Sequence, residues 1–199
     1  MKLARILTLA ITSTIMIPQF AFAHVGLGDA HGALHGFSHP LMGIDHLLAM
    51  VSVGLLAVNL GGRAIWAVPA SFVVMMVLGG VLGITGFVLP LTEFGIGVSL
   101  LVLGMLITMA VRVPVSIAMT LAAASAIFHG FAHGAEMPEN TTGFMFAAGF
   151  VIATALLHIF GILLGLGIAR FSRAASQRML KVAGGVAALV GVALVSGIV

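Results

Sequence analysis

Histidine and carboxylate side chains gather at the front of an apolar run in the stretch HPLMGIDH. His39, Asp45 and His46 precede a series of mostly apolar residues that reaches Leu60. An aspartate in the middle of a membrane helix costs about 2.5–3.5 kcal/mol even on lenient insertion scales, so such residues are functional by default. Imidazole with carboxylate suits nickel, cobalt and zinc, whereas magnesium and calcium prefer oxygen ligands. These three residues are therefore candidate ligands of a divalent transition metal.

A single continuous helix would place two of these side chains together. At about 100° per residue, His39 and His46 share one face, with methionines between and beyond them. Pro40 suits the first turn of this helix, with His39 near its cap. Asp45 points about 100° away from His46. We therefore expect Asp45 either to complete the site from another angle or to orient a ligand histidine through a hydrogen bond.

A second polar stretch, FHGFAHGAE, carries two histidines and a carboxylate. His129 and His133 are separated by four positions, and Glu136 follows three later. If the helix continues that far, all three fall within about 60° of arc. Two imidazoles at i and i+4 with a carboxylate form a natural clamp for a divalent cation. Two glycines in the stretch could instead end the helix early and leave Glu136 in the outer loop, beside the mouth, that is, the periplasmic entrance to the predicted site. We expect both stretches to converge on one cavity in the outer leaflet.

The remaining histidines lie before the first stretch and deep in a later apolar run. His31, His35 and His39 recur every fourth residue and would form one stripe on a helix, although two glycines also permit a loop. With His24, they could collect ions before the mouth, or they could form a solvated tail. His158 lies deep in the fifth apolar run. It is either a ligand on the way across the membrane or a histidine that links helices by a hydrogen bond.

The composition is that of a polytopic membrane protein of the all-α class. Of 199 residues, 61% are hydrophobic and only 7% are charged, against about 25% in a typical soluble domain. Since there is no cysteine, disulfides, thiolate metal sites and catalytic thiols are excluded. The high pI comes from a few basic residues with few acids and indicates no nucleic-acid partner. The partner indicated by this composition is the lipid bilayer.

The first 23 residues have the pattern of a secretory signal peptide. Lys2 and Arg5 form a charged region, an apolar region follows, and an A-x-A cleavage site ends at Ala23. Cleavage would leave His24 as the mature N-terminus on the outer side of a bacterial inner membrane. A free α-amine beside an imidazole is a ready chelating pair. The alternative is an uncleaved first helix.

Six apolar segments follow an outer, histidine-rich segment at 24–38, and each is near the ~20 residues that cross a bilayer. The connections between them are too short for a soluble domain, so 39–199 is predicted to be one bundle of six transmembrane helices. Gly-x-x-x-Gly spacings favour close packing, within the bundle or between protomers of a homo-oligomer. The predicted spans are 39–60, 64–88, 94–111, 114–133, 142–169 and 179–198.

Charge placement predicts the orientation of this bundle. With the mature N-terminus outside, every cation of the mature chain falls on the cytoplasmic side, as the positive-inside rule requires. We therefore expect a multi-pass inner-membrane protein with both mature termini in the periplasm. The cytoplasmic cations are Arg63, Arg112, Arg170, Arg173, Arg178 and Lys181, and the outer acids are Asp29, Glu93, Glu136 and Glu139.

Both polar stretches match signatures of a known family. HPLMGIDH resembles the H-x5-DH signature, and FHGFAHGAE the FHG-x-[A/V]-HG-x-E signature, of the HupE/UreJ family of bacterial metal permeases. The signal and the six spans are also similar to that family, so the resemblance covers essentially the whole chain. It implies uptake of nickel, or of cobalt in some members, and an indirect link to the maturation of nickel or cobalt enzymes. By motif position, the residues that correspond are His39, Asp45, His46, His129, His133 and Glu136.

Together these features predict a permease, not an enzyme, that takes up nickel first and cobalt next by facilitated diffusion. No Walker sequence is present, and a divalent ion entering down about 100 mV gains roughly 4.6 kcal/mol. The metal is cargo, and no prosthetic group is expected. Twelve methionines make copper(I) a rival cargo. Two other functions stay open: a metal-binding or sensing protein without transport, and an intramembrane metal hydrolase, for which Ser125 lies four residues before His129.

Overall fold

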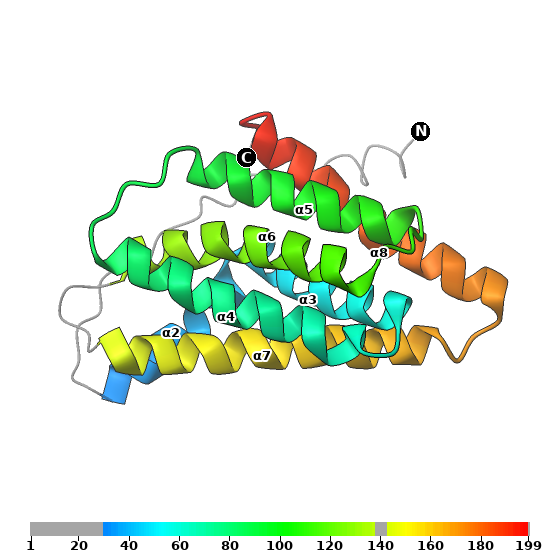
Figure 1. Ribbon diagram of the computed structural model, residues 1–199, viewed down its shortest axis with the longest axis horizontal. Coiled ribbons are helices and arrows are strands. Elements are labelled where there is room, and N and C mark those ends of the chain that lie inside the picture. The colour runs from blue at the N-terminus through cyan, green and yellow to red at the C-terminus, as the bar shows by residue number, and fades with distance from the viewer. Residues whose placement is uncertain (1–29, 138–142, 199) are drawn as a thin grey trace, which may run out of the picture.

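The computed structural model describes residues 30–137 and 143–198 (Figure 1). This part of the chain contains helices and no strand, which confirms the all-α class. The predicted signal peptide at 1–23 lies outside the described residues, as do His24, Asp29 and Glu139. The helices are α2 Ala30–Met42, α3 Ile44–Leu60, α4 Ala64–Ile84, α5 Thr92–Thr108, α6 Val115–Ala135, α7 Gly143–Ile168 and α8 Arg173–Val195.

The first predicted span is broken rather than continuous. The axes of α2 and α3 differ by 83° across Gly43, whose backbone is extended at φ −87° and ψ 118°. The prediction that Pro40 opens a helix is wrong, because Pro40 lies in the last turn of α2. Proline lacks the N–H that would continue the helical ladder. The side chain of Asp45 folds back over the break, so that a Cβ at Gly43 would lie 2.7 Å from Asp45 Oδ1.

Four helices, α4, α6, α7 and α8, are long and apolar enough to cross a membrane. The bent pair α2 and α3 would add a fifth, broken span, whereas α5 has 17 residues and is shorter. At 1.5 Å per residue, α5 covers about 25 Å, slightly less than a hydrocarbon core of about 30 Å. The structure therefore supports the membrane-helix character of the chain, and the count of six spans stays a prediction.

The last helix begins earlier than expected. The sequence predicted a cytoplasmic loop up to residue 178, but α8 begins at Arg173. Ser172 caps it, because its Oγ accepts a hydrogen bond from the amide of Ala175 at 3.4 Å. Serine is a favoured N-cap residue since it satisfies an otherwise unpaired amide of the first turn.

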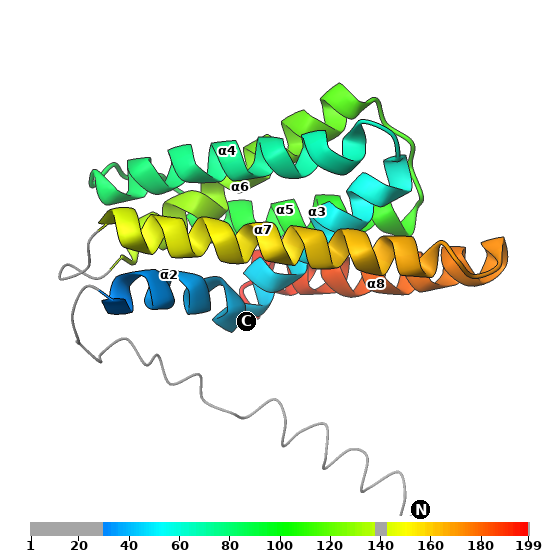
Figure 2. The same cartoon turned by 90° about the horizontal axis from the view of Figure 1, so that it is seen from below.

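The long helices run side by side along the long axis of the molecule, and α2 lies against the first half of α7 (Figures 1 and 2). Glycine faces allow the closest approaches. A Cβ at Gly54 of α3 would lie 2.5 Å from the carbonyl oxygen of His158 on α7. At Gly130 of α6, a Cβ would overlap the carbonyl of Met76 on α4. The Gly-x-x-x-Gly spacing that begins at Gly79 serves this same contact between α4 and α6.

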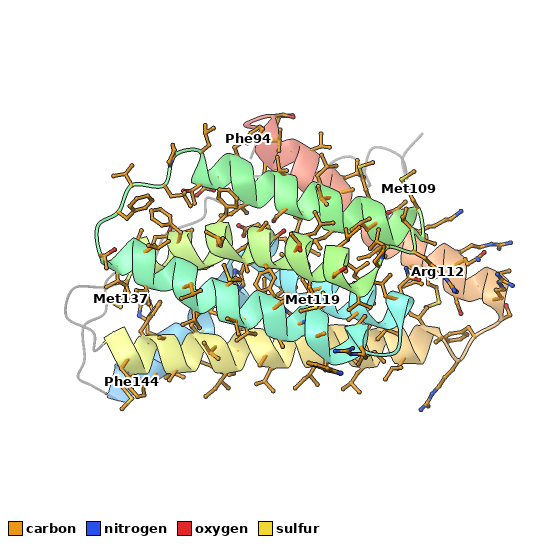
Figure 3. The ribbon with its side chains drawn as sticks, viewed as in Figure 1. Phe94, Met109, Arg112, Met119, Met137 and Phe144 are labelled. Carbon is orange, nitrogen blue, oxygen red and sulfur yellow. The ribbon has the colours of Figure 1, made fainter. Side chains whose placement is uncertain are left out.

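Apolar side chains cover the outside of the bundle, and polar ones lie within it. Leu163 and Val182 are 62% and 68% exposed, as expected of side chains that face lipid. Figure 3 shows such side chains projecting from α4 and α7, with Arg112 at one end of the molecule and Met137 and Phe144 at the other. The buried polar side chains instead come from α3, α5, α6 and α7, and they are His46, Ser52, Ser99, Ser125, His129, Thr154 and His158.

The close packing of α4 and α6 makes a prediction about stability. We expect Gly130→Ala to lower the Tm of the purified protein. Overpacking typically costs about 1–3 kcal/mol, and here this cost outweighs the roughly 1 kcal/mol by which alanine is favoured over glycine in a helix. Gly185→Ala on α8 is the matched control, since a Cβ there meets nothing within 4 Å. It should leave the Tm unchanged or raise it. An equal response of both variants would contradict the packing described here.

Candidate metal site

The two polar stretches of the sequence meet in space. His46 lies in the first turn of α3, and its Nδ1 is 2.9 Å from Nε2 of His133 near the end of α6. His39 lies near the end of α2, with its ring centroid 4.7 Å from that of His133. The convergence expected from the sequence is therefore seen, but the break at Gly43 brings it about. His39 and His46 do not share one helix face.

An outer group of candidate ligands is formed by His39, His133 and Glu136. Glu136 Oε2 lies 3.3 Å from His39 Nε2 and 3.9 Å from His133 Nδ1. One ligand atom from each residue lies within 4.8 Å of the others. Two ligands of one ion at about 2.0–2.2 Å can lie up to about 4.4 Å apart, so an ion fits here after small side-chain shifts. The Glu136 side chain is 61% exposed, so this group is accessible from outside the bundle.

The position of Glu136 settles one alternative left by the sequence. The helix α6 continues through both glycines to Ala135, and Glu136 is its C-cap residue. The carboxylate therefore stays within reach of His133 instead of moving into the following loop.

An inner group of candidate ligands is formed by His46 and His129, which have no exposed surface. Their ring centroids lie 5.3 Å apart. His46 Nε2 and His129 Nδ1 are buried and have no hydrogen-bond partner in the described part of the chain. Buried polar atoms are normally paired, so each such atom calls for an explanation. A metal ion shared by these two nitrogens is one such explanation, because imidazole nitrogen is a suitable ligand for divalent transition metals.

His133 connects the two groups. Its ring is edge-on to that of His39 at 4.7 Å and to that of His46 at 4.6 Å. One ring nitrogen approaches Glu136 in the outer group, and the other is hydrogen-bonded to His46 in the inner group. The ligands therefore form a continuous series from the exposed end of α6 into the buried core.

Aromatic side chains of α7 form the wall of this series. The Phe150 ring lies 5.1 Å from His46 and 4.8 Å from His133, and the Phe146 ring lies 5.8 Å from His39. Such rings exclude water and strengthen electrostatic interactions beside them. Neither residue was predicted from the sequence. Their signal was a spacing of four on a mostly apolar helix, which does not distinguish a site wall from ordinary core.

His158 lies deeper, on α7, and is 2% exposed. Neither of its ring nitrogens has a hydrogen-bond partner among residues 30–137 and 143–198, so the helix-linking hydrogen bond considered above is not observed. The Phe72 ring lies 5.3 Å from His158 and 5.9 Å from His129, between the inner group and this deeper histidine. Thr154 donates to Met76 Sδ at 3.5 Å and does not engage His158.

Asp45 is half-buried and forms no hydrogen bond or ion pair with the clustered histidines in the described structure. The pKa of Glu93, in the first turn of α5 before the apolar stretch begins, is raised by burial and then by the negative charges of Asp45 and Glu136. Three carboxylates thus gather at one end of the bundle. Concentrated negative charge attracts cations to such a mouth.

Two of the histidines before the first motif, His31 and His35, lie on a helix and not in a loop. His35 is on α2, and its ring is 5.9 Å from that of His39, outside the cluster of ligand atoms. His31 lies in the first turn of the same helix. His24 is among the residues that the structure does not describe.

Apolar helices around a buried series of histidines define a helical membrane protein with a ligand set suited to a divalent metal. The profile of the HupE / UreJ protein family matches residues 12–194. The chain belongs to the HupE/UreJ family, as its two motifs indicated. It is 45% identical over 199 residues to Protein HupE of Rhizobium leguminosarum bv. viciae, covering 99% of this chain and 100% of that protein. No solved structure matches the chain.

The inner group predicts which substitutions weaken metal binding most. Loss of a residue that only hydrogen-bonds to a ligand typically costs roughly 10–100-fold in metal affinity. We expect His46→Ala and His129→Ala each to cost more than this, because each removes a proposed ligand. His35→Ala should lose less, since its ring lies outside the cluster. Isothermal titration of the purified protein with Ni²⁺ measures these affinities. Unchanged affinity in both variants would exclude the inner group as a binding site.

Proposed function

We propose that this protein is an inner-membrane permease that takes up a divalent transition metal, nickel first and cobalt next, from the periplasm. The observation that supports this most strongly is the placement of His133 between an exposed ligand group and a fully buried one. A protein that only binds metal needs one closed site. A series of ligands leading inwards suits an ion that moves by exchanging one set for the next.

The proposed path has three stages. The ion is first held by the outer group, His39, His133 and Glu136, which Glu93 and Asp45 assist by their charge. It then passes to the inner group, His46 and His129. Beyond Phe72 it reaches His158, whose two ring nitrogens have no protein partner in the described residues. Each transfer replaces some ligands before all are lost, which avoids a bare ion in an apolar interior.

The orientation follows from the charges at the two ends. The end that carries Arg112 lies opposite the end that carries Met137 and Phe144 (Figure 3), and the positive-inside rule assigns Arg112 to the cytoplasm. The outer group then faces the periplasm, and both mature termini do so as well. A potential of about 100 mV, negative inside, favours entry of a divalent ion by roughly 4.6 kcal/mol, which is about 10³-fold accumulation. Facilitated diffusion therefore needs no other source of energy.

The hydrolase alternative loses its proposed nucleophile. Ser125 donates its hydroxyl proton to the carbonyl of Leu121 at 2.8 Å. The serine that contacts His129 is Ser99 on α5, at 2.9 Å. Its hydroxyl also lies 2.7 Å from the carbonyl oxygen of Ile96, to which it donates. A binding or sensing protein without transport remains the alternative that an experiment must separate from a permease.

Uptake of labelled nickel and cobalt, in competition, by cells lacking other permeases tests the proposal. We expect uptake by the unaltered protein and little in Asp45→Asn, which keeps the size of the side chain and removes its charge. His158→Ala should retain nickel binding at the outer end and slow its passage, because the deeper ligand is lost. Protein levels are matched by immunoblotting.

Two outcomes would contradict this scheme. Nickel binding without uptake by the unaltered protein would assign a binding or sensing function. Unchanged uptake in His158→Ala would remove His158 from the path.

A further inference from the structure

Ser99 is a buried serine of α5 whose hydroxyl lies between two polar atoms. Its Oγ is 2.7 Å from the carbonyl oxygen of Ile96 in the preceding turn and 2.9 Å from Nε2 of His129 on α6. The residue is 4% exposed, so water does not compete for these contacts. Neither polar stretch of the sequence includes it.

The protons in this contact can be assigned from the chemistry of the partners. A carbonyl oxygen only accepts, so the single hydroxyl proton of Ser99 is donated to Ile96. Ser99 Oγ therefore presents a lone pair to His129, and Nε2 of the ring must donate. A neutral imidazole carries one N–H, so Nδ1 of His129 keeps a free lone pair. This atom is buried and has no partner in the described structure.

The opposite assignment is unfavourable. If Ser99 donated to Nε2, the ring proton of His129 would lie on Nδ1, where the described residues offer no acceptor. A buried N–H without an acceptor is costly because it has lost its hydrogen bonds to water. The ring proton of His129 therefore lies on Nε2, and the free lone pair lies on Nδ1.

We propose that Ser99 is a positioning residue that fixes the tautomer of His129 and so presents Nδ1 as the metal ligand of the inner group. A ligand histidine must offer a lone pair, and the hydrogen bond at its other nitrogen determines which nitrogen does so. The His46 ring, 5.3 Å away, contributes the second nitrogen, Nε2, which is also buried and unpartnered in the described residues. This inference rests on the proposed metal site and adds the orientation of its ligands.

The tautomer can be read directly in metal-free protein. Protein labelled with ¹⁵N-histidine is placed in lipid nanodiscs, and the His129 signals are assigned by comparison with His129→Gln. In the unaltered protein, ¹⁵N NMR should show His129 protonated at Nε2. Ser99→Ala should give a mixture of tautomers, and Ser99→Thr, which keeps the hydroxyl, should restore the Nε2 form.

Ser125→Ala is the matched control for this substitution. It removes a buried hydroxyl one turn before His129 on the same helix, but that hydroxyl contacts only Leu121. The affinity for Ni²⁺ should fall about 10–100-fold in Ser99→Ala and stay near the original value in Ser99→Thr and Ser125→Ala. A purely structural role of Ser99 would not produce a change of tautomer.

Two results would overturn the inference. One is His129 protonated at Nδ1 in the unaltered protein, a result that does not depend on any Ser99 variant. The other is a Ser99→Ala variant with unchanged tautomer or unchanged nickel affinity. Failure of the unaltered protein to transport nickel would instead contradict the permease, because the tautomer is measured without metal or transport.

Discussion

Burial of imidazole in an apolar bundle is the constraint on which the rest of this structure depends. An unpaired polar group in such surroundings costs several kcal/mol, yet four helices contribute buried polar side chains to one region. The hydrogen bond between His46 and His133, at 2.9 Å, joins α3 to α6 at the point where the two motifs meet. The aromatic rings of α7 and the broken helix at Gly43 both serve to keep these side chains together. The ring nitrogens that have no partner among the described residues are the atoms that would suit a divalent metal ion.

The break at Gly43 has a functional consequence as well as a structural one. A continuous helix would stack His39 and His46 along one face, at two depths of the same wall. The 83° bend instead lets α2 pack on α7 and bring His39 to Glu136, while α3 carries His46 into the core. One short motif therefore contributes His39 to the outer group of candidate ligands and His46 to the inner group. The same bend exposes one group to the mouth and encloses the other.

The sequence predicted which polar side chains lie together better than it predicted their surroundings. Polar residues in membrane helices are costly, so the two motifs stood out, and α4 and α7 followed from apolar length alone. The bend at Gly43 was missed because proline favours the first turn of a helix, whereas Pro40 lies in the last turn of a helix that packs on α7. Ser99, Phe146 and Phe150 were missed for a different reason. Their roles depend on how helices far apart in the chain pack, which depends on glycine faces whose partners the sequence does not name.

The central claim is that the buried and half-buried histidines hold the transported ion itself. X-ray absorption spectroscopy of the nickel-loaded protein tests it most directly, because imidazole ligands give a characteristic multiple-scattering pattern. The account predicts coordination by more than one imidazole with additional oxygen or nitrogen ligands, and a loss of imidazole scattering in His46→Ala. Nickel surrounded only by oxygen, with a spectrum that His46→Ala does not change, would contradict it.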